Sequence, residues 1–173
     1  MKKYFRKKCD LSKIKNIFAK GKIQMNEFTI QEIRAVYQEK KVETYGDLKN
    51  VTSSFQVARW LEKEIGSLTQ EHLVAVYMNT KNEVISFSVI HIGTIDQSIA
   101  YPRDIFQRAL LTNSARVIIA HNHPSGSAKP SEADKIFTKR IIRAGELMNI
   151  EILDHIIVTD NEFCSLRAEG LWQ

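Results

Sequence analysis

The residues best suited to chemistry lie in one short segment that contains two histidines, a serine and an aspartate. His121 and His123 are two positions apart and directly follow the apolar run Val117 to Ala120, which predicts a short buried strand. Side chains two positions apart on an extended chain point to the same face. The two imidazoles therefore form half of a candidate metal site at the end of a strand.

The third candidate ligand is Asp134, in the first turn of a segment that begins at Ser131. Pro124, Gly126 and Pro130 mark a loop before it, so the carboxylate could return to the histidines. Two histidines and one carboxylate leave a fourth position for water, which is how catalytic zinc is held. Ser-x-x-Asp before an apolar run is also close to a capping box, so capping is the alternative for this tetrapeptide. The two roles are compatible, because Ser131 can cap a helix while Asp134 binds a metal.

The spacing His-x-His, seven residues, Ser-x-x-Asp resembles the motif of the JAMM metalloproteases, also called the MPN or JAB family. The run His121-Asn122-His123-Pro124-Ser125-Gly126 is similar to the signature of the RadC-like branch. Other similar pieces are Gly93-Thr94, Pro102-Arg103-Asp104, Asp154-His155-Ile156-Ile157-Val158 and Gly170-Leu171. The resemblance covers roughly residues 51 to 173. It implies the MPN/JAB (cytidine-deaminase-like) α/β fold, with a central mixed β-sheet flanked by helices.

The resemblance also implies an activity, namely a zinc-dependent hydrolase that cuts a peptide or isopeptide bond of an unidentified substrate. One Zn²⁺ per chain would be held by three residues: His121, His123 and Asp134. In this family an upstream glutamate is the general acid/base and the motif serine supports the oxyanion. Carried over to this sequence, these two catalytic residues are Glu71 and Ser131.

Three of the candidate side chains have competing interpretations. Glu71 precedes a predicted core strand, and the alternative for it is an exposed carboxylate at a strand end. Asp104 competes for the role of base, although its position after Pro102 favours a place in the first turn of a helix. His155 could contact a metal ligand or a substrate, but we favour a structural role for it.

Other functions remain open beside the hydrolase. RadC-like proteins are traditionally linked to DNA repair, a label that names no reaction. The other alternative is a non-catalytic MPN interaction module, but such modules usually lose motif ligands and this chain has all of them. An HNH nuclease is disfavoured because its motif residues are spread over tens of positions. A zinc deaminase is disfavoured because neither His-x-Glu nor Pro-Cys-x-x-Cys occurs.

Composition predicts one folded domain with a small extension. The chain has 173 residues, is 43% hydrophobic and carries a net charge of +5. We expect a basic helical extension over residues 1–50 and the metal-binding domain over residues 51–173. The first 22 residues hold nine Lys or Arg against one Asp, which suggests weak contact with nucleic acid, although a solvated terminus is the favoured interpretation.

The cellular setting follows from what the sequence lacks. Its two cysteines are far apart and form no Cys-x-x-Cys pattern, which argues against a disulfide scaffold and a thiolate zinc site. No apolar run approaches 18 residues and no signal-peptide core follows the basic start, so we expect a cytoplasmic protein that does not enter membranes. The oligomeric state is not predicted.

Periodicity predicts the elements that must position the motif. Alternating and apolar runs favour strands at residues 72–79, 83–92, 116–121, 150–158 and 163–166. Capping patterns and apolar stripes favour helices at residues 29–41, from 53 to a stop at Gly66, from Pro102 onward and at 131–148. Strands and helices mix without strict alternation, so we expect a mixed sheet with helices on both faces.

Overall fold

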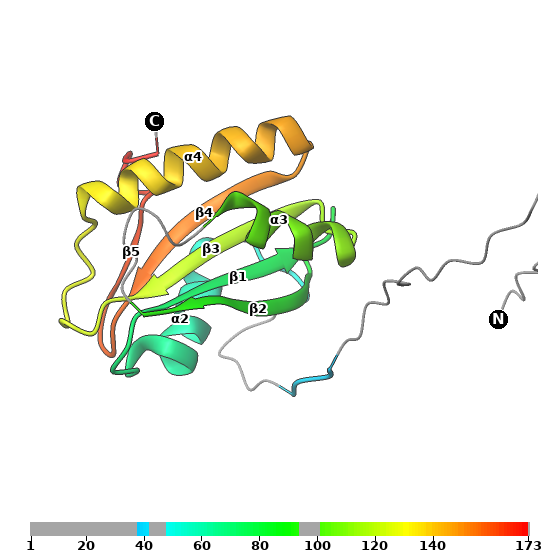
Figure 1. Ribbon diagram of the computed structural model, residues 1–173. Coiled ribbons are helices and arrows are strands. Elements are labelled where there is room, and N and C mark those ends of the chain that lie inside the picture. Colours follow the sequence, from blue (N-terminus) through cyan, green and yellow to red (C-terminus); the bar gives the residue numbers. More distant parts are fainter. Residues whose placement is uncertain (1–37, 42–47, 94–100, 173) are drawn as a thin grey trace, which may run out of the picture. The chain divides into compact units, whose positions relative to one another are not determined.

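The computed structural model describes residues 38–41, 48–93 and 101–172 (Figure 1). In chain order its elements are α2 (Ser54–Leu61), a π-helical turn η1 (Glu62–Gly66), β1 (His72–Met78), β2 (Val84–Ile92), α3 (Pro102–Leu111), β3 (Arg116–Asn122), α4 (Glu132–Met148), β4 (Glu151–Val158) and β5 (Phe163–Ser165). Within this described part, no helix has the length and apolar character needed to cross a bilayer. Most of the helix predicted over 29–41 lies outside the described residues, and its described end, 38–41, is not helical.

The five strands form one mixed sheet in the order β2-β1-β3-β4-β5. β1 runs antiparallel to β2 and to β3, β3 runs parallel to β4, and β4 runs antiparallel to β5. Helix α4 makes the long crossover that a parallel pair requires. The prediction of a mixed α/β fold is confirmed. β3, which carries the histidine motif, lies at the centre of the sheet.

Alternation along the central strands divides the core into two layers. Val74 and Val76 of β1 face α2 and η1, while Leu73 and Ala75 face α3 and α4. Figure 1 shows the same arrangement, with α2 on one side of the sheet and α3 and α4 on the other. Because both faces are covered, β1 and β3 are buried almost throughout.

The helix that begins at Ser54 ends at Gly66, as predicted, because α2 continues into the π-helical turn η1, whose last residue is Gly66. The structure adds a second reason for glycine at this position. A Cβ at Gly66 would lie 2.2 Å from the backbone oxygen of Thr159. The position therefore requires glycine because the backbone of the β4–β5 connection passes directly against it.

Candidate metal centre

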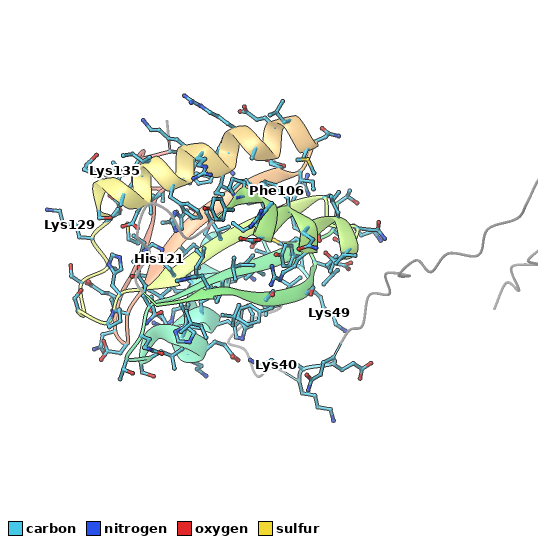
Figure 2. The ribbon with its side chains drawn as sticks, in the orientation of Figure 1. Lys40, Lys49, Phe106, His121, Lys129 and Lys135 are labelled. Atoms are coloured by element: carbon cyan, nitrogen blue, oxygen red, sulfur yellow. The ribbon has the colours of Figure 1, made fainter. Side chains whose placement is uncertain are left out.

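The motif histidines lie where β3 ends. His121 is completely buried, paired with Leu73 of β1 on one side and Ile157 of β4 on the other. His123 begins the loop that leads to α4, and its amide N–H is bonded to the backbone oxygen of Val158. Figure 2 shows His121 at this end of the sheet, with Lys129 and Lys135 on the loop and on α4 nearby. The strand end therefore directs a buried imidazole toward the start of α4.

Four side chains converge at this strand end. The Nε2 atoms of His121 and His123 are 3.0 Å apart. Asp134 approaches both rings, with Oδ1 3.3 Å from Nε2 of His121 and Oδ2 3.7 Å from Nε2 of His123. Glu71 Oε1 lies 3.8 Å from Nε2 of His121. The structure thus brings together the three predicted ligands and the predicted general base.

The backbone determines which nitrogen of His123 is available for a metal. Nδ1 of His123 lies 2.8 Å from the carbonyl oxygen of Ser127. A carbonyl only accepts hydrogen bonds, so this contact requires a proton on Nδ1. In the neutral ring the Nε2 atom then presents a lone pair toward His121 and Asp134, which is the arrangement of a metal-binding histidine.

Ser131 and Asp134 form both the helix cap and part of the site. Ser131 is the N-cap of α4, and its Oγ accepts a hydrogen bond from the Asp134 amide at 3.2 Å. In return, the Ser131 amide and hydroxyl both donate to Oδ2 of Asp134, at 2.7 and 2.6 Å. The capping alternative and the metal alternative are therefore compatible, because Oδ2 is held by the cap while Oδ1 faces His121.

The ionisation state of Asp134 follows from the groups around it. Burial raises the pKa of the Asp134 carboxyl, but the hydrogen bond and charge interaction with His121, together with the bonds from Ser131, outweigh burial and hold the pKa well below its usual range. Asp134 is therefore a carboxylate at neutral pH. With Glu71, it places two acidic side chains around two imidazoles, a combination that a divalent cation neutralises.

Glu71 is positioned by Asn122, which no motif in the sequence marks as part of the site. Asn122, between the two histidines, is completely buried and faces away from them. Its Oδ1 accepts from the amide of His72 at 2.7 Å, and its Nδ2 donates to the carbonyls of Leu68 and Gln70 at 3.0 and 3.1 Å. Asn122 therefore ties the segment that carries Glu71 to the strand that carries the histidines. The alternation of a strand was the only sequence signal that Asn122 points to the opposite face.

His155, for which a structural role was favoured, lies directly against His121. Nε2 of His155 is 2.9 Å from Nδ1 of His121, and Nδ1 of His155 is 2.5 Å from the hydroxyl of Thr138. Burial, together with the nearby His121, holds the pKa of His155 far below its ordinary value, so the ring is neutral. Sequence spacing does not reveal the contacts of His155. This residue lies on β4, whereas its partners His121 and Thr138 lie on β3 and α4.

The remaining candidates lie outside this group. Asp104 occupies the first turn of α3, where its carboxylate is 3.5 Å from Arg103. Its position matches the helix-start interpretation. His72 binds the carbonyl of Gln70 through Nδ1. The basic segment before residue 23 lies outside the described residues, so the predicted contact with nucleic acid stays a prediction.

The donor atoms fit a small divalent cation. Tetrahedral coordination with bonds of about 2.0–2.1 Å separates donors by about 3.3–3.4 Å. The distances from His121 Nε2 to His123 Nε2 and to Asp134 Oδ1, 3.0 and 3.3 Å, are close to that value. A second set is also compact, because donor atoms of Glu71, His121 and His123 lie within 4.8 Å of one another. We favour Asp134 as the ligand because it is the more buried carboxylate and approaches both imidazoles.

A groove of about 270 Å³ opens beside His123. Its walls are the loop after η1, the loop after β3 and the turn after β4: Gly66, Ser67, Leu68, Thr69, His123, Pro124, Ser125, Gly126 and Asp160. The groove reaches the exposed edge of His123, whose side chain is 17% accessible, whereas the His121 side chain is closed to solvent.

Comparison with known proteins identifies the family of the chain. The model of the RadC-like JAB domain matches residues 51–171. A UPF0758 protein of Enterococcus faecalis is 47% identical over 122 residues, which are 70% of this chain and 53% of that protein. One of Latilactobacillus sakei is 36% identical over 163 residues, 94% of this chain and 71% of that protein. The chain spans about half the length of the Enterococcus relative. It belongs to the RadC-like JAB domain family.

Proposed function

We propose that the protein is a zinc-dependent hydrolase of the JAMM type that cleaves a peptide or isopeptide bond. The observation that carries the proposal is the convergence of two imidazole nitrogens and a carboxylate at one point, with a second carboxylate beside them. A structural zinc site is closed by four protein ligands, whereas three ligands with an accessible side are typical of a catalytic one.

His121, His123 and Asp134 would hold the ion. When bound, zinc supplies a Lewis acid that polarises a carbonyl and makes water acidic enough to react near neutral pH. Glu71 accepts the proton from the attacking water at Oε1 and later delivers it to the leaving amine. The Glu71 side chain is 18% accessible, so water can reach this carboxylate. The hydrogen bonds from Asn122 to the backbone beside Glu71, which we call the Asn122 clamp, keep this segment in place.

Ser131 has two possible roles, orienting Asp134 and stabilising the oxyanion, and its hydrogen bonds favour the first. Its hydroxyl proton is directed at Asp134 Oδ2 in this structure. We assign Ser131 first to orienting Asp134. Stabilising the oxyanion is a second role, which requires the hydroxyl to turn from Asp134 toward the substrate oxygen.

The proposal is tested with zinc-loaded protein and a mixed library of peptides and isopeptide-linked peptides, with products identified by mass spectrometry. We expect cleavage that a chelator abolishes and added zinc restores. Glu71→Gln should keep its zinc and lose cleavage by about 10²–10⁴-fold, because it removes the proton acceptor. Glu146→Gln, the same change at an exposed position on α4, serves as the matched control.

Each result has a distinct meaning. Full activity in Glu71→Gln would remove Glu71 from the reaction. Absence of cleavage across the library by a protein that holds zinc would contradict the peptidase and favour the interaction module. A zinc site that catalyses no reaction would still fix the conformation of the loop at this edge of the sheet. A docking module needs such a fixed surface.

A further inference from the structure

The contact between His121 and His155 is the first link of a buried chain of hydrogen bonds. Nδ1 of His121 meets Nε2 of His155 at 2.9 Å, and Nδ1 of His155 meets the Thr138 hydroxyl at 2.5 Å. That hydroxyl lies 2.6 Å from the backbone oxygen of Asp134. His121, His155 and Thr138 are all 0% exposed. The chain therefore starts at one candidate ligand and ends on the backbone of another, without contact with water.

The last acceptor favours one of the two directions that this chain can take. The carbonyl of Asp134 can only accept, so its contact with Thr138 is a hydrogen bond only in the direction in which the Thr138 hydroxyl donates to it. The oxygen of Thr138 is then available to accept a proton from Nδ1 of His155. With its proton on Nδ1, the neutral His155 ring accepts at Nε2, which requires a proton on Nδ1 of His121. In this direction each donor has one acceptor, and Nε2 of His121 keeps a lone pair for a cation held between it, His123 and Asp134.

We propose that His155 and Thr138 are positioning residues that hold His121 in its metal-binding tautomer. The proposal rests on the proposed function in one respect, namely that His121 binds the ion through Nε2. The opposite direction is also possible without a metal. In that state Nε2 of His121 is protonated and donates toward His123 and the Asp134 carboxylate, His155 donates to His121, and Thr138 donates to His155 instead of to Asp134. Metal binding selects the first direction because a protonated Nε2 cannot be a ligand.

Removal of the Thr138 hydroxyl affects the two directions of the chain unequally. In the metal-binding direction Nδ1–H of His155 would have no acceptor in a fully buried place, and an unsatisfied buried donor is costly. In the opposite direction the same nitrogen would merely lack a donor. Thr138→Val therefore penalises the metal-binding state more than the other. Partners of metal-binding histidines are typically worth about 10–100-fold in metal affinity.

The test measures zinc affinity by competition with a chelator of known affinity. Thr138→Val should bind zinc about 10–100-fold more weakly than the parent, and Thr138→Ser, which keeps the hydroxyl, should restore binding to within about threefold. Thr112→Val is the matched control, because Thr112 makes the same bond to the carbonyl four residues earlier but contacts no imidazole in the described residues. His155→Gln, which can still accept from His121, should lose less affinity than His155→Leu.

A second readout reports the protons themselves. Nitrogen-15 spectra of the imidazoles in the zinc-loaded protein should show both His121 and His155 protonated on Nδ1. Protonation of His155 on Nε2 in that sample, or unchanged zinc affinity in Thr138→Val and His155→Leu, would overturn the proposal. If the parent binds no zinc, the proposed function fails. The proton shared between the His121 and His155 rings would then be the remaining test of the hydrogen-bonded chain. It should exchange slowly in the parent and be absent in His155→Leu.

Discussion

Replacement of Asn122 by alanine removes the clamp between the two sides of the candidate site. The amide makes three hydrogen bonds, one to the His72 N–H and two to carbonyls, and is completely buried itself. A net hydrogen bond is worth about 1 kcal/mol, so three are worth about 3 kcal/mol. Gln70 is exposed and the other two partners are half-buried, so water can replace part of this. We expect Asn122→Ala to lower the free energy of unfolding by about 2–3 kcal/mol.

Urea unfolding followed by circular dichroism measures this loss. With a slope of about 1.5–2 kcal/mol per molar urea for a domain of this size, the midpoint should fall by about 1–2 M. Asn161→Ala, a change of the same type at an exposed position, should shift the free energy of unfolding by less than about 0.5 kcal/mol. Hydrogen exchange gives the local view, because the His72 amide should exchange faster in Asn122→Ala.

The metal-binding side of the clamp should respond differently. His121 and His123 point away from Asn122, so zinc affinity should change far less than stability does. Unfolding within 0.5 kcal/mol of the parent, with an unchanged exchange rate at His72, would refute the clamp. Loss of zinc without loss of stability would show instead that Asn122 acts on the histidines.

Two further predictions concern other parts of the fold. Gly66→Ala should lower the free energy of unfolding by about 3 kcal/mol, because its Cβ would lie 2.2 Å from a backbone oxygen. Gly170→Ala should lower it by about 1 kcal/mol, because the position has open space but a φ of +69°. Equal losses of stability in thermal unfolding would contradict this difference. Burial, then the nearby acidic side chains, raise the pKa of the Cys164 thiol. In a Cys9→Ser background, alkylation of Cys164 should therefore have its pH midpoint above that of a free thiol, and a midpoint at or below that value would contradict it.

The sequence was sufficient for the elements because each one carries its own local signal. The apolar run before His121, the Ser131 cap and the turn before residue 83 predict strand, helix and hairpin, and the structure has them within one or two residues. The stop at Gly66 was predicted, but the packing requirement for glycine there was not, because it comes from Thr159, nearly a hundred positions away. A glycine that ends a helix and one that admits a passing backbone look the same in sequence.

Only the local part of the candidate site was predictable from the sequence. The spacing within one strand end and one helix start predicts that His121, His123 and Asp134 lie close together, and the structure places them so, since short loops bring such neighbours together. The partners behind them come from distant segments: His155 is 34 positions from His121, and the clamp of Asn122 spans 50 positions to His72. Only the order of strands in the sheet brings these residues together, and no local pattern encodes that order.

The most direct test of the account is the metal content of purified protein, supplied with zinc and then freed of loosely bound ions, beside three variants. We predict about one zinc per chain in the parent and in Glu71→Gln, and almost none in His123→Ala or Asp134→Asn. Zinc retained in Asp134→Asn but lost in Glu71→Gln would replace Asp134 by Glu71 in the ligand set. A parent without zinc would contradict the proposed metal site, because the convergence of His121, His123 and Asp134 would then be a capped loop.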